Sequence, residues 1–197
     1  MWIFTIGSGR WNLLGKLPHG LHSHSAAAWS VSGKPNSERD EKTAIIVSGG
    51  LSGDGILSAN ANIYMINPRD RRSGIDVIRT RGPYITRFGH TSHVHHSKLF
   101  LVGGVAASGC EQPGVGIVDL ATGTSVELQV DAGVPAADIC LYHHCSNFQE
   151  AEAERPRIFV FGGGGNCFSF GCHFSKHCLE IDVTMAIELM SKGENGA

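Results

Sequence analysis

The sequence has few charged residues, few aromatic residues and no long apolar run. Its apolar stretches fall far short of the ~20 residues that a membrane helix needs, so no membrane-spanning helix is expected. No basic region precedes Met1-Trp2-Ile3-Phe4, so a signal peptide is not expected either. Of the 197 residues, 17% are charged and 8% aromatic, with a net charge of −2. This composition predicts a soluble, strand-rich, cytoplasmic protein that has no membrane partner.

Cysteine is present but lacks the spacing of a disulfide scaffold. The sequence contains no CxxC pair and no spacing typical of small secreted domains, so we expect reduced thiols. The six cysteines are Cys110, Cys140, Cys145, Cys167, Cys172 and Cys178.

Glycine is abundant, and it recurs directly after apolar runs. Three short apolar runs begin at residues 44, 99 and 158, and each one leads into a pair of glycines. An apolar run that ends in glycine is typical of a buried strand followed by a tight turn. The spacing between the runs is close to the ~50 residues of a kelch propeller blade. The chain is therefore predicted to consist of repeats.

The flanks of the three runs repeat as well. A histidine followed by small or polar residues precedes each run, and an alternating strand follows it, at residues 62–66, 116–120 and 179–183. A fourth strand is expected at 75–79 and at 124–130, and it is weak in the last unit. Four short strands per unit are typical of a propeller blade. The histidines His24, His90 and His144 are expected to form hydrogen bonds in the core.

We therefore expect an all-β fold: a partial kelch-type β-propeller with about three blades of four-stranded antiparallel sheets. The count falls below the ~4 to 8 blades that close a propeller, so the chain is expected to be a fragment or to need strands from elsewhere. The predicted units are residues 1–20 (the third and fourth strands of a preceding blade), 21–82, 83–131 and 132–184 (one blade each), and 185–197 (a tail with at most one helical turn).

The sequence predicts no catalytic, cofactor-binding or metal-binding residue. The run from Cys167 to Cys178 contains metal-capable side chains, but their order matches no standard zinc motif. The residues from Arg87 to His96 include several histidines, which we likewise interpret as structural. The glycines at 162–165 are not followed by the helix of a phosphate-binding loop. No nucleophile elbow or carboxylate pair is present.

One stretch is specific to a family. Residues 162–171, Gly-Gly-Gly-Gly-Asn-Cys-Phe-Ser-Phe-Gly, closely resemble the signature of the C-terminal kelch domain of the tRNA wybutosine-synthesizing protein 4 family, also called the leucine carboxyl methyltransferase 2 family. Residues 87–93, 99–105 and 113–123 also fit this family. The resemblance covers about residues 85 to 183, whereas the first predicted blade resembles kelch repeats only in general.

The resemblance implies a role in tRNA modification. In that family a methyltransferase domain that uses S-adenosylmethionine precedes the propeller. The complete enzyme methylates and methoxycarbonylates the tricyclic base beside the anticodon of phenylalanine tRNA. This chain shows no such domain, so the resemblance assigns it no cofactor or catalytic residue. It implies that the propeller portion holds tRNA or shapes the active site. The missing methyltransferase domain and missing blades are then its expected partners.

A cluster of arginines is the candidate for tRNA contact. Residues 69 to 87 contain six arginines and only two acidic residues, Asp70 and Asp76, although the whole chain has a net charge of −2. Arginine neutralises phosphates and stacks on unpaired bases. The candidate residues are Arg69, Arg71, Arg72, Arg79, Arg81 and Arg87.

Two further function classes remain open from the sequence. A generic kelch interaction module, for example a ubiquitin-ligase adaptor, would use the loops on one propeller face to bind a protein. A propeller enzyme would need polar groups that converge at the central channel.

Overall fold

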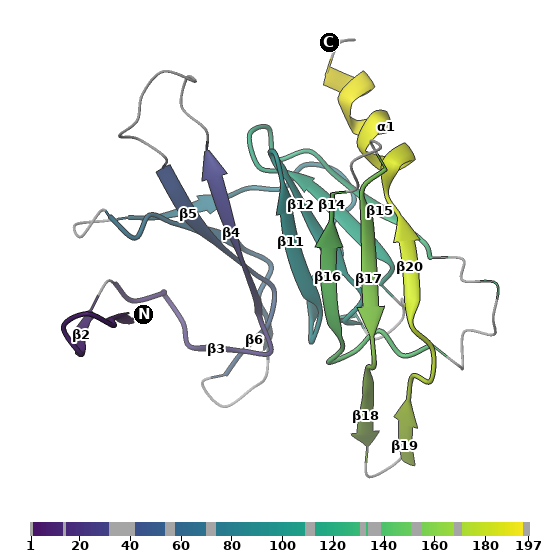
Figure 1. The fold of residues 1–197 in the computed structure, drawn as a ribbon, viewed down its shortest axis with the longest axis horizontal. Coiled ribbons are helices and arrows are strands. Elements are labelled where there is room, and N and C mark those ends of the chain that lie inside the picture. Colours follow the sequence, from purple (N-terminus) through teal and green to yellow (C-terminus); the bar gives the residue numbers. More distant parts are fainter. Residues whose placement is uncertain are drawn as a thin grey trace. The chain divides into compact units, whose positions relative to one another are not determined.

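The computed structural model describes residues 2–13, 15–31, 42–53, 58–69, 74–108, 113–130, 133, 139–150, 155–167 and 171–194. Within these ranges the chain is almost entirely β-strand (Figure 1). It divides into two compact units, Met1–Leu128 and Gln129–Ala197. No helix in the described ranges has the length and apolar character needed to cross a bilayer.

Two four-stranded antiparallel sheets form the body of the first unit. In each one the chain runs up and down through neighbouring strands, so that sequence order and spatial order coincide. The alternating or continuous apolar pattern of these strands suits sheets that are covered on their faces. The first sheet contains β4 (Ser25–Val31), β5 (Lys42–Ser48), β8 (Ile63–Ile66) and β9 (Ile75–Ile78), and the second contains β11 (Thr91–His95), β12 (Lys98–Val102), β14 (Val115–Asp119) and β15 (Ser125–Leu128).

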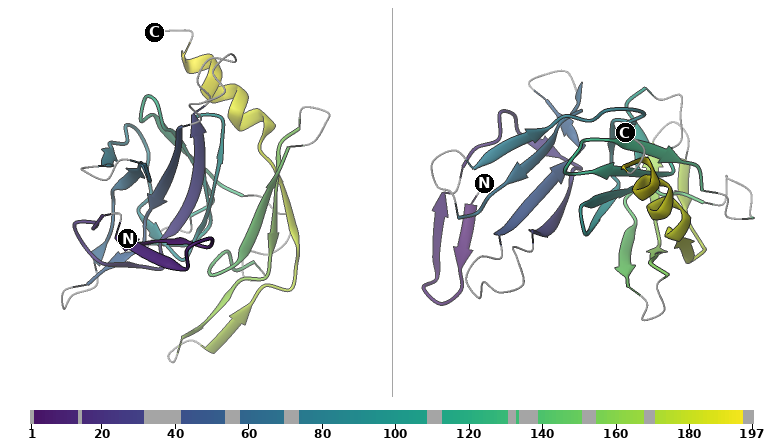
Figure 2. Two further views of the ribbon diagram at one scale, coloured as in Figure 1. Left: turned by 60° about the vertical axis from the view of Figure 1, so that its left-hand side comes forward. Right: turned by 90° about the horizontal axis from the view of Figure 1, so that it is seen from above.

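Smaller ladders extend these sheets. In the first unit the strands before His24 and His90 each pair with the strand after the next glycine pair, so β3 pairs with β6, and β10 pairs with β13. A separate hairpin at the start of the chain, β1 with β2, forms its own two-stranded ribbon, drawn in purple (Figure 2). The bounds are β1 (Trp2–Thr5), β2 (Arg10–Leu13), β3 (Leu21–His22), β6 (Leu51–Ser52), β7 (Ser58–Ala59), β10 (Arg87–Phe88) and β13 (Val105–Ala106).

The second unit has a three-stranded sheet, a hairpin and a helix. Its antiparallel sheet has the order β16-β17-β20, and the hairpin of β18 and β19 is joined to β17 and to β20 (Figure 1). The carboxylate of Asp182 accepts a hydrogen bond from the Thr184 amide at 2.9 Å and so caps the helix. The elements are β16 (Cys145–Gln149), β17 (Arg157–Phe161), β18 (Gly164–Cys167), β19 (Gly171–Phe174), β20 (Leu179–Asp182) and α1 (Thr184–Glu194).

The core of the first unit lies where its two sheets face each other. Ile46 and Ile63 of the first sheet pack with Leu99, Leu101 and Val118 of the second, and all five side chains are fully buried. Each such side chain contributes roughly 1.5–3 kcal/mol through removal from water. The opposite face of the first sheet is covered as well: a second cluster there contains Val47, Tyr64 and Ile66, and Leu17 and Leu21 pack against it.

A backbone motif recurs at the start of each predicted blade. The residue before each repeated histidine has a left-handed conformation, and so does the second glycine of each pair. A side chain on that glycine would meet the histidine Cβ at 2.8, 2.9 and 3.2 Å in the three repeats, which explains why the position is glycine. The residues before the histidines are Ser23, Gly89 and His143, and the glycine–histidine pairs are Gly50–His24, Gly104–His90 and Gly163–His144.

The all-β prediction is confirmed, and the up-and-down sheets are those of propeller-type blades. The helix is longer than predicted, because α1 runs over eleven residues. Its buried residues Ala186 and Met190 lie on the same side of the helix as Val183, which precedes it. The exact limits of the predicted blades stay predictions.

Candidate nucleic-acid interface

The described members of the arginine cluster include three exposed side chains. Arg69 lies in the turn after β8, and Arg79 and Arg81 follow the end of β9. Arg69 and Arg79 therefore stand at opposite ends of β9, whose four residues span about 13 Å. Within the described ranges no ion pair joins these three guanidinium groups to a carboxylate. The three exposed arginines that the structure describes thus present positive charge at two separate points.

The backbone that carries Arg79 and Arg81 is fixed by the second sheet. The Arg81 amide donates a hydrogen bond to the Gly123 carbonyl at 2.7 Å, and the Ser125 amide donates to the Arg81 carbonyl at 2.8 Å. Gly123 has a positive φ of 77°, and a Cβ there would lie 2.2 Å from the Arg79 carbonyl oxygen. The connection between the two sheets is therefore held closely, while its arginine side chains point into solvent.

Arg71 and Arg72 lie outside the described residues, so their predicted role stays a prediction. Arg87 differs from the other arginines because the structure buries it completely. Its guanidinium group forms an ion pair with Glu127 and donates to the carbonyl oxygens of Ile85 and Gly103 at 3.1 and 3.2 Å. Since every face of this group meets protein, we leave Arg87 out of the proposed contact set.

Two residues, Gly116 and Tyr84, lie close to the buried ion pair of Arg87 and Glu127. Gly116 faces it, and a Cβ at that position would come within 3.0 Å of both Arg87 and Glu127. The Tyr84 hydroxyl is buried without a hydrogen-bond partner in the described residues. Burial raises the pKa of Tyr84 to about 12, against the influence of the Arg87 charge and with that of Glu127. The arrangement is therefore part of the packed interior of the first unit.

The predicted structural role of the repeated histidines holds for His90 but not for His24. Nε2 of His90 lies 2.7 Å from Ser25 Oγ and 3.2 Å from Ser48 Oγ, which belong to the first sheet. His144 is buried as well, whereas His24 is exposed.

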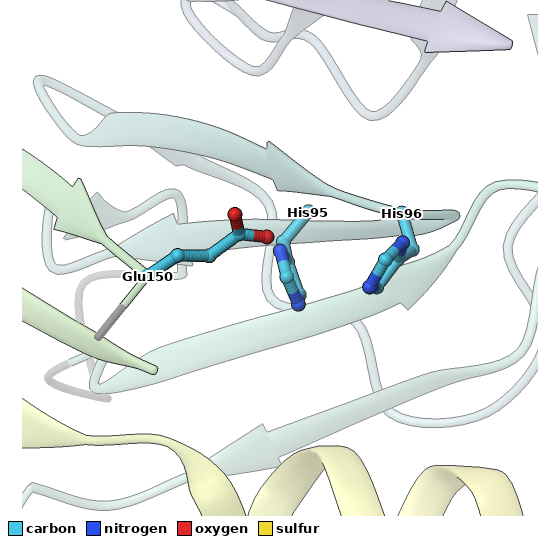
Figure 3. A group of neighbouring side chains, drawn as sticks. All are labelled: His95, His96 and Glu150. Atoms are coloured by element: carbon cyan, nitrogen blue, oxygen red, sulfur yellow. The ribbon is translucent and has the colours of Figure 1, made fainter. Parts of the chain in front are cut away.

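The remaining histidines of the second sheet lie on β11 and its turn. Burial lowers the pKa of His93, and this favours the neutral imidazole. His95 and His96 stand at the tip of the β11–β12 hairpin with their ring centres 4.1 Å apart (Figure 3). Glu150, also drawn there, follows β16 and belongs to the second unit. We place no site on these residues.

Sequence reasoning did not single out the aromatic face of the first hairpin. Trp2, Phe4 and Trp11 are all exposed, and the rings of Phe4 and Trp11 lie 5.0 Å apart across the two strands. The alternation of Trp2, Phe4 and Ile6 is a visible signal in the sequence, but by itself it indicates only a strand.

A comparison with curated proteins identifies two relatives of this chain. It is 31% identical over 170 residues to tRNA wybutosine-synthesizing protein 4 of Rattus norvegicus, which covers 86% of this chain and 22% of the rat protein. It is 29% identical over 188 residues to tRNA wybutosine-synthesizing protein 4 of Homo sapiens, which covers 93% of this chain and 25% of the human protein. This chain belongs to the tRNA wybutosine-synthesizing protein 4 family. No protein-family model matches it.

The similarity to wybutosine-synthesizing protein 4 covers only a limited part of those proteins. The chain spans about a quarter of the length of the curated relatives it matches, and the match lies in their C-terminal part.

The family signature at residues 162–171 falls on the β18–β19 hairpin. The backbone of β18 pairs with that of β19 from Gly164 opposite Phe174 to Cys167 opposite Gly171. Residues 168–170 lie outside the described ones, as do the side chains of Cys167, Cys172 and His173. The predicted absence of a metal site there stays a prediction.

Proposed function

We propose that this chain is the β-propeller portion of a wybutosine-synthesizing protein and that it binds phenylalanine tRNA. The printed name of its relatives, tRNA wybutosine-synthesizing protein 4, supports a role in wybutosine biosynthesis. In this proposal the propeller holds tRNA while another part of the full protein carries out the chemistry.

The observation that carries the tRNA contact is the exposed pair Arg79 and Arg81. Both guanidinium groups reach solvent from a backbone that is fixed by hydrogen bonds to Gly123 and Ser125. Because this backbone is already fixed, contact with a phosphate costs mainly the ordering of the two arginine side chains. Arginine also stacks on the unpaired bases of RNA loops. Arg69 is exposed beyond the other end of β9. Arg71 and Arg72 lie outside the described residues, and we keep them in the proposed contact set on the sequence alone.

The remaining features of the proposal follow from the resemblance. The repeats would be kelch blades. The full protein would be a cytoplasmic methyltransferase and methoxycarbonyltransferase, and it would bind S-adenosylmethionine outside this chain. Isothermal titration calorimetry of the purified chain with S-adenosylmethionine tests the last point. Saturable binding at micromolar concentration would contradict it.

Filter binding of phenylalanine tRNA to the full-length protein at several salt concentrations tests the contact. Each phosphate contact contributes about 0.7–0.9 to the slope of log affinity against log salt. We therefore expect the double change Arg79→Ala and Arg81→Ala to reduce this slope by about 1 to 2 units. Adding Arg71→Ala and Arg72→Ala should reduce it further if these residues share the footprint.

The matched control removes two positive charges elsewhere. Arg155 and Lys176 are exposed in the second unit, and changing both to alanine gives the same net charge as the test variant. The proposal requires the control to keep the wild-type slope. An equal slope for the test variant and the wild type would remove this surface from the tRNA footprint.

A further inference from the structure

An aromatic stack stands beside the glycine-rich segment of the second unit. The ring centres of Tyr142 and His143 are 4.0 Å apart, and the two ring planes differ by 17°. The His143 side chain is exposed, whereas that of Tyr142 is partly buried. An exposed ring that is already stacked on one neighbour offers a flat π surface to a further ring. The stack is therefore suited to bind a planar group.

The backbone of His143 has a conformation that favours glycine. Its φ is 51°, and the equivalent residue of the second repeat is Gly89, with a φ of 67°. Glycine adopts this left-handed region without steric cost, and a histidine does not. Strain of this kind at a residue other than glycine is frequent at functional sites. Since glycine would suit the turn at position 143, the turn does not account for the imidazole ring.

The stack is tied to the family signature by backbone hydrogen bonds. The Gly164 amide donates to the Tyr142 carbonyl at 2.8 Å, and the Ser175 amide donates to the Gly163 carbonyl at 2.8 Å. A Cβ at Gly163 would lie 2.1 Å from the Cys140 carbonyl oxygen, so glycine is needed for this close approach. The ring pair is thus held in place before any ligand arrives, which reduces the cost of binding.

The segments that build this end of the second unit contain no carboxylate. Residues 139–149 and 158–179 include no aspartate or glutamate. By contrast, Glu150 and Asp182 stand at the opposite end of the β16-β17-β20 sheet, where α1 begins (Figure 1). Carboxylates would repel the phosphates that flank an RNA base. The aromatic stack therefore lies where a nucleic acid can approach without like-charge repulsion.

We propose that the Tyr142–His143 stack binds an unpaired base of RNA, which stacks on the exposed imidazole ring. Every base has a flat π face, and stacking on aromatic side chains is a common way in which proteins hold unpaired RNA. The proposal rests on the tRNA binding put forward under the proposed function. It adds to that function a contact that raises affinity without neutralising a phosphate.

Replacing His143 by glycine removes the ring and gives the turn the residue found in the second repeat. Filter binding of phenylalanine tRNA to the full-length protein at several salt concentrations measures the effect. We expect His143→Gly to weaken binding by about tenfold or more at each salt concentration. The slope of log affinity against log salt should stay that of the wild type, because no phosphate contact is lost. His143→Phe keeps a flat ring and should bind within about threefold of the wild type.

Two further variants separate the ring from the backbone. Ser23 occupies the equivalent position of the first repeat with a φ of 54°, so Ser23→Gly relieves the same strain but removes no ring. This control should leave tRNA binding within about twofold. His143→Asn removes the ring while its side chain tolerates the left-handed conformation, and it should weaken binding as His143→Gly does. Thermal unfolding of each variant shows that the fold is retained.

Four results would overturn the proposal. Wild-type affinity of His143→Gly and His143→Asn would remove the stack from the RNA footprint, and the proposed function would stand if Arg79→Ala with Arg81→Ala still reduced the salt slope. A reduced slope for His143→Gly would show that the imidazole meets a phosphate and not a base. Equal weakening by His143→Phe would show that a flat ring is not what the RNA recognises. A wild-type protein that does not bind phenylalanine tRNA would refute the proposed function together with this contact.

Discussion

His90 and Ser25 join the two sheets of the first unit through a hydrogen bond of 2.7 Å between Nε2 and Oγ. Both residues are buried, and the imidazole also reaches Ser48 Oγ at 3.2 Å. Hydrogen bonds of this kind contribute about 1 kcal/mol each, and a buried polar group that loses its partner costs about 1–3 kcal/mol. The contact therefore helps to hold the two neighbouring sheets together.

Replacing His90 by alanine should lower the free energy of unfolding by about 2–4 kcal/mol, because it removes the hydrogen bonds and leaves a cavity. Urea unfolding followed by circular dichroism measures the change. His90→Gln should recover part of the loss, since the glutamine amide nitrogen reaches nearly the same point as Nε2. His19→Ala, at an exposed histidine, is the control. Equal stability of His90→Ala and His19→Ala would refute the structural role.

Removing one partner of the buried ion pair should be far more costly than removing one of an exposed pair. Arg87 and Glu127 are 0% and 7% exposed, whereas Arg157 and Glu180 are 37% and 48% exposed. We expect Arg87→Met to destabilise the first unit by about 3–5 kcal/mol, because Glu127 is left with an uncompensated charge. Arg157→Met should cost about 0–1 kcal/mol.

The double change Arg87→Met with Glu127→Met completes this test. It removes both charges, so its stability should exceed that of Arg87→Met alone. Chemical denaturation of the four proteins gives the comparison. A double variant that is less stable than Arg87→Met alone would contradict the expectation that the unpaired charge of Glu127 causes the loss of stability.

Gly49 and Gly9 have nearly the same backbone conformation but very different surroundings. Their φ angles are 60° and 62°. A Cβ at Gly49 would lie 2.3 Å from the Arg87 carbonyl oxygen, while one at Gly9 meets nothing within 4 Å. Gly9→Ala should therefore cost only the left-handed strain of about 1–2 kcal/mol. Gly49→Ala should cost clearly more, and thermal unfolding of both variants measures the difference. Equal melting temperatures for Gly49→Ala and Gly9→Ala would show that the two sheets move apart easily to make room for the added methyl group.

Tyr84 should make the first unit less stable at alkaline pH. Burial raises its pKa from 10.0 to about 12 in the folded protein. Above pH 10 the unfolded chain loses this proton while the folded chain keeps it, so stability falls as the pH rises from 10 to 12. The loss reaches about 2–3 kcal/mol at the upper end.

The variant Tyr84→Phe isolates this effect. It should lack that part of the alkaline decline and should match or exceed the wild type at neutral pH, because the hydroxyl it removes is buried without a partner in the described part of the chain. Unfolding in urea at pH 7 and at several values between 10 and 12 provides the measurement. Parallel alkaline declines for the two proteins would contradict the raised pKa.

Strand runs and their turns could be predicted from the sequence because they depend on local pattern. The apolar runs at 44–47, 99–102 and 158–161 fall within β5, β12 and β17, and the first hairpin lies where its alternation placed it. These features need only period-two alternation followed by glycine. The resemblance to the family rests on the motif at residues 162–171, which residues 87–93, 99–105 and 113–123 support.

Features that depend on distant partners could not be predicted in this way. In the sequence Arg87 is one more arginine of the same cluster as Arg81. It is nevertheless buried, because Glu127, which is far along the chain, forms an ion pair with it. The one local indication was Gly116, a glycine inside a strand, which often marks close approach of another group. The left-handed residues before the histidines were missed since two of the three are Ser23 and His143 and not glycine.

The hydrogen bond between His90 and Ser25 also bears on the order in which a growing chain can fold. The first sheet can form its whole ladder once Ile78 has emerged from the ribosome, but its buried serines must wait for His90, which comes 65 residues after Ser25. Until then the face around Ile46 and Ile63 has no cover from the second sheet. A ribosome that pauses when Ile78 has emerged and the second sheet has not would hold a nascent chain with a complete sheet and an exposed apolar face, the state in which chaperones bind.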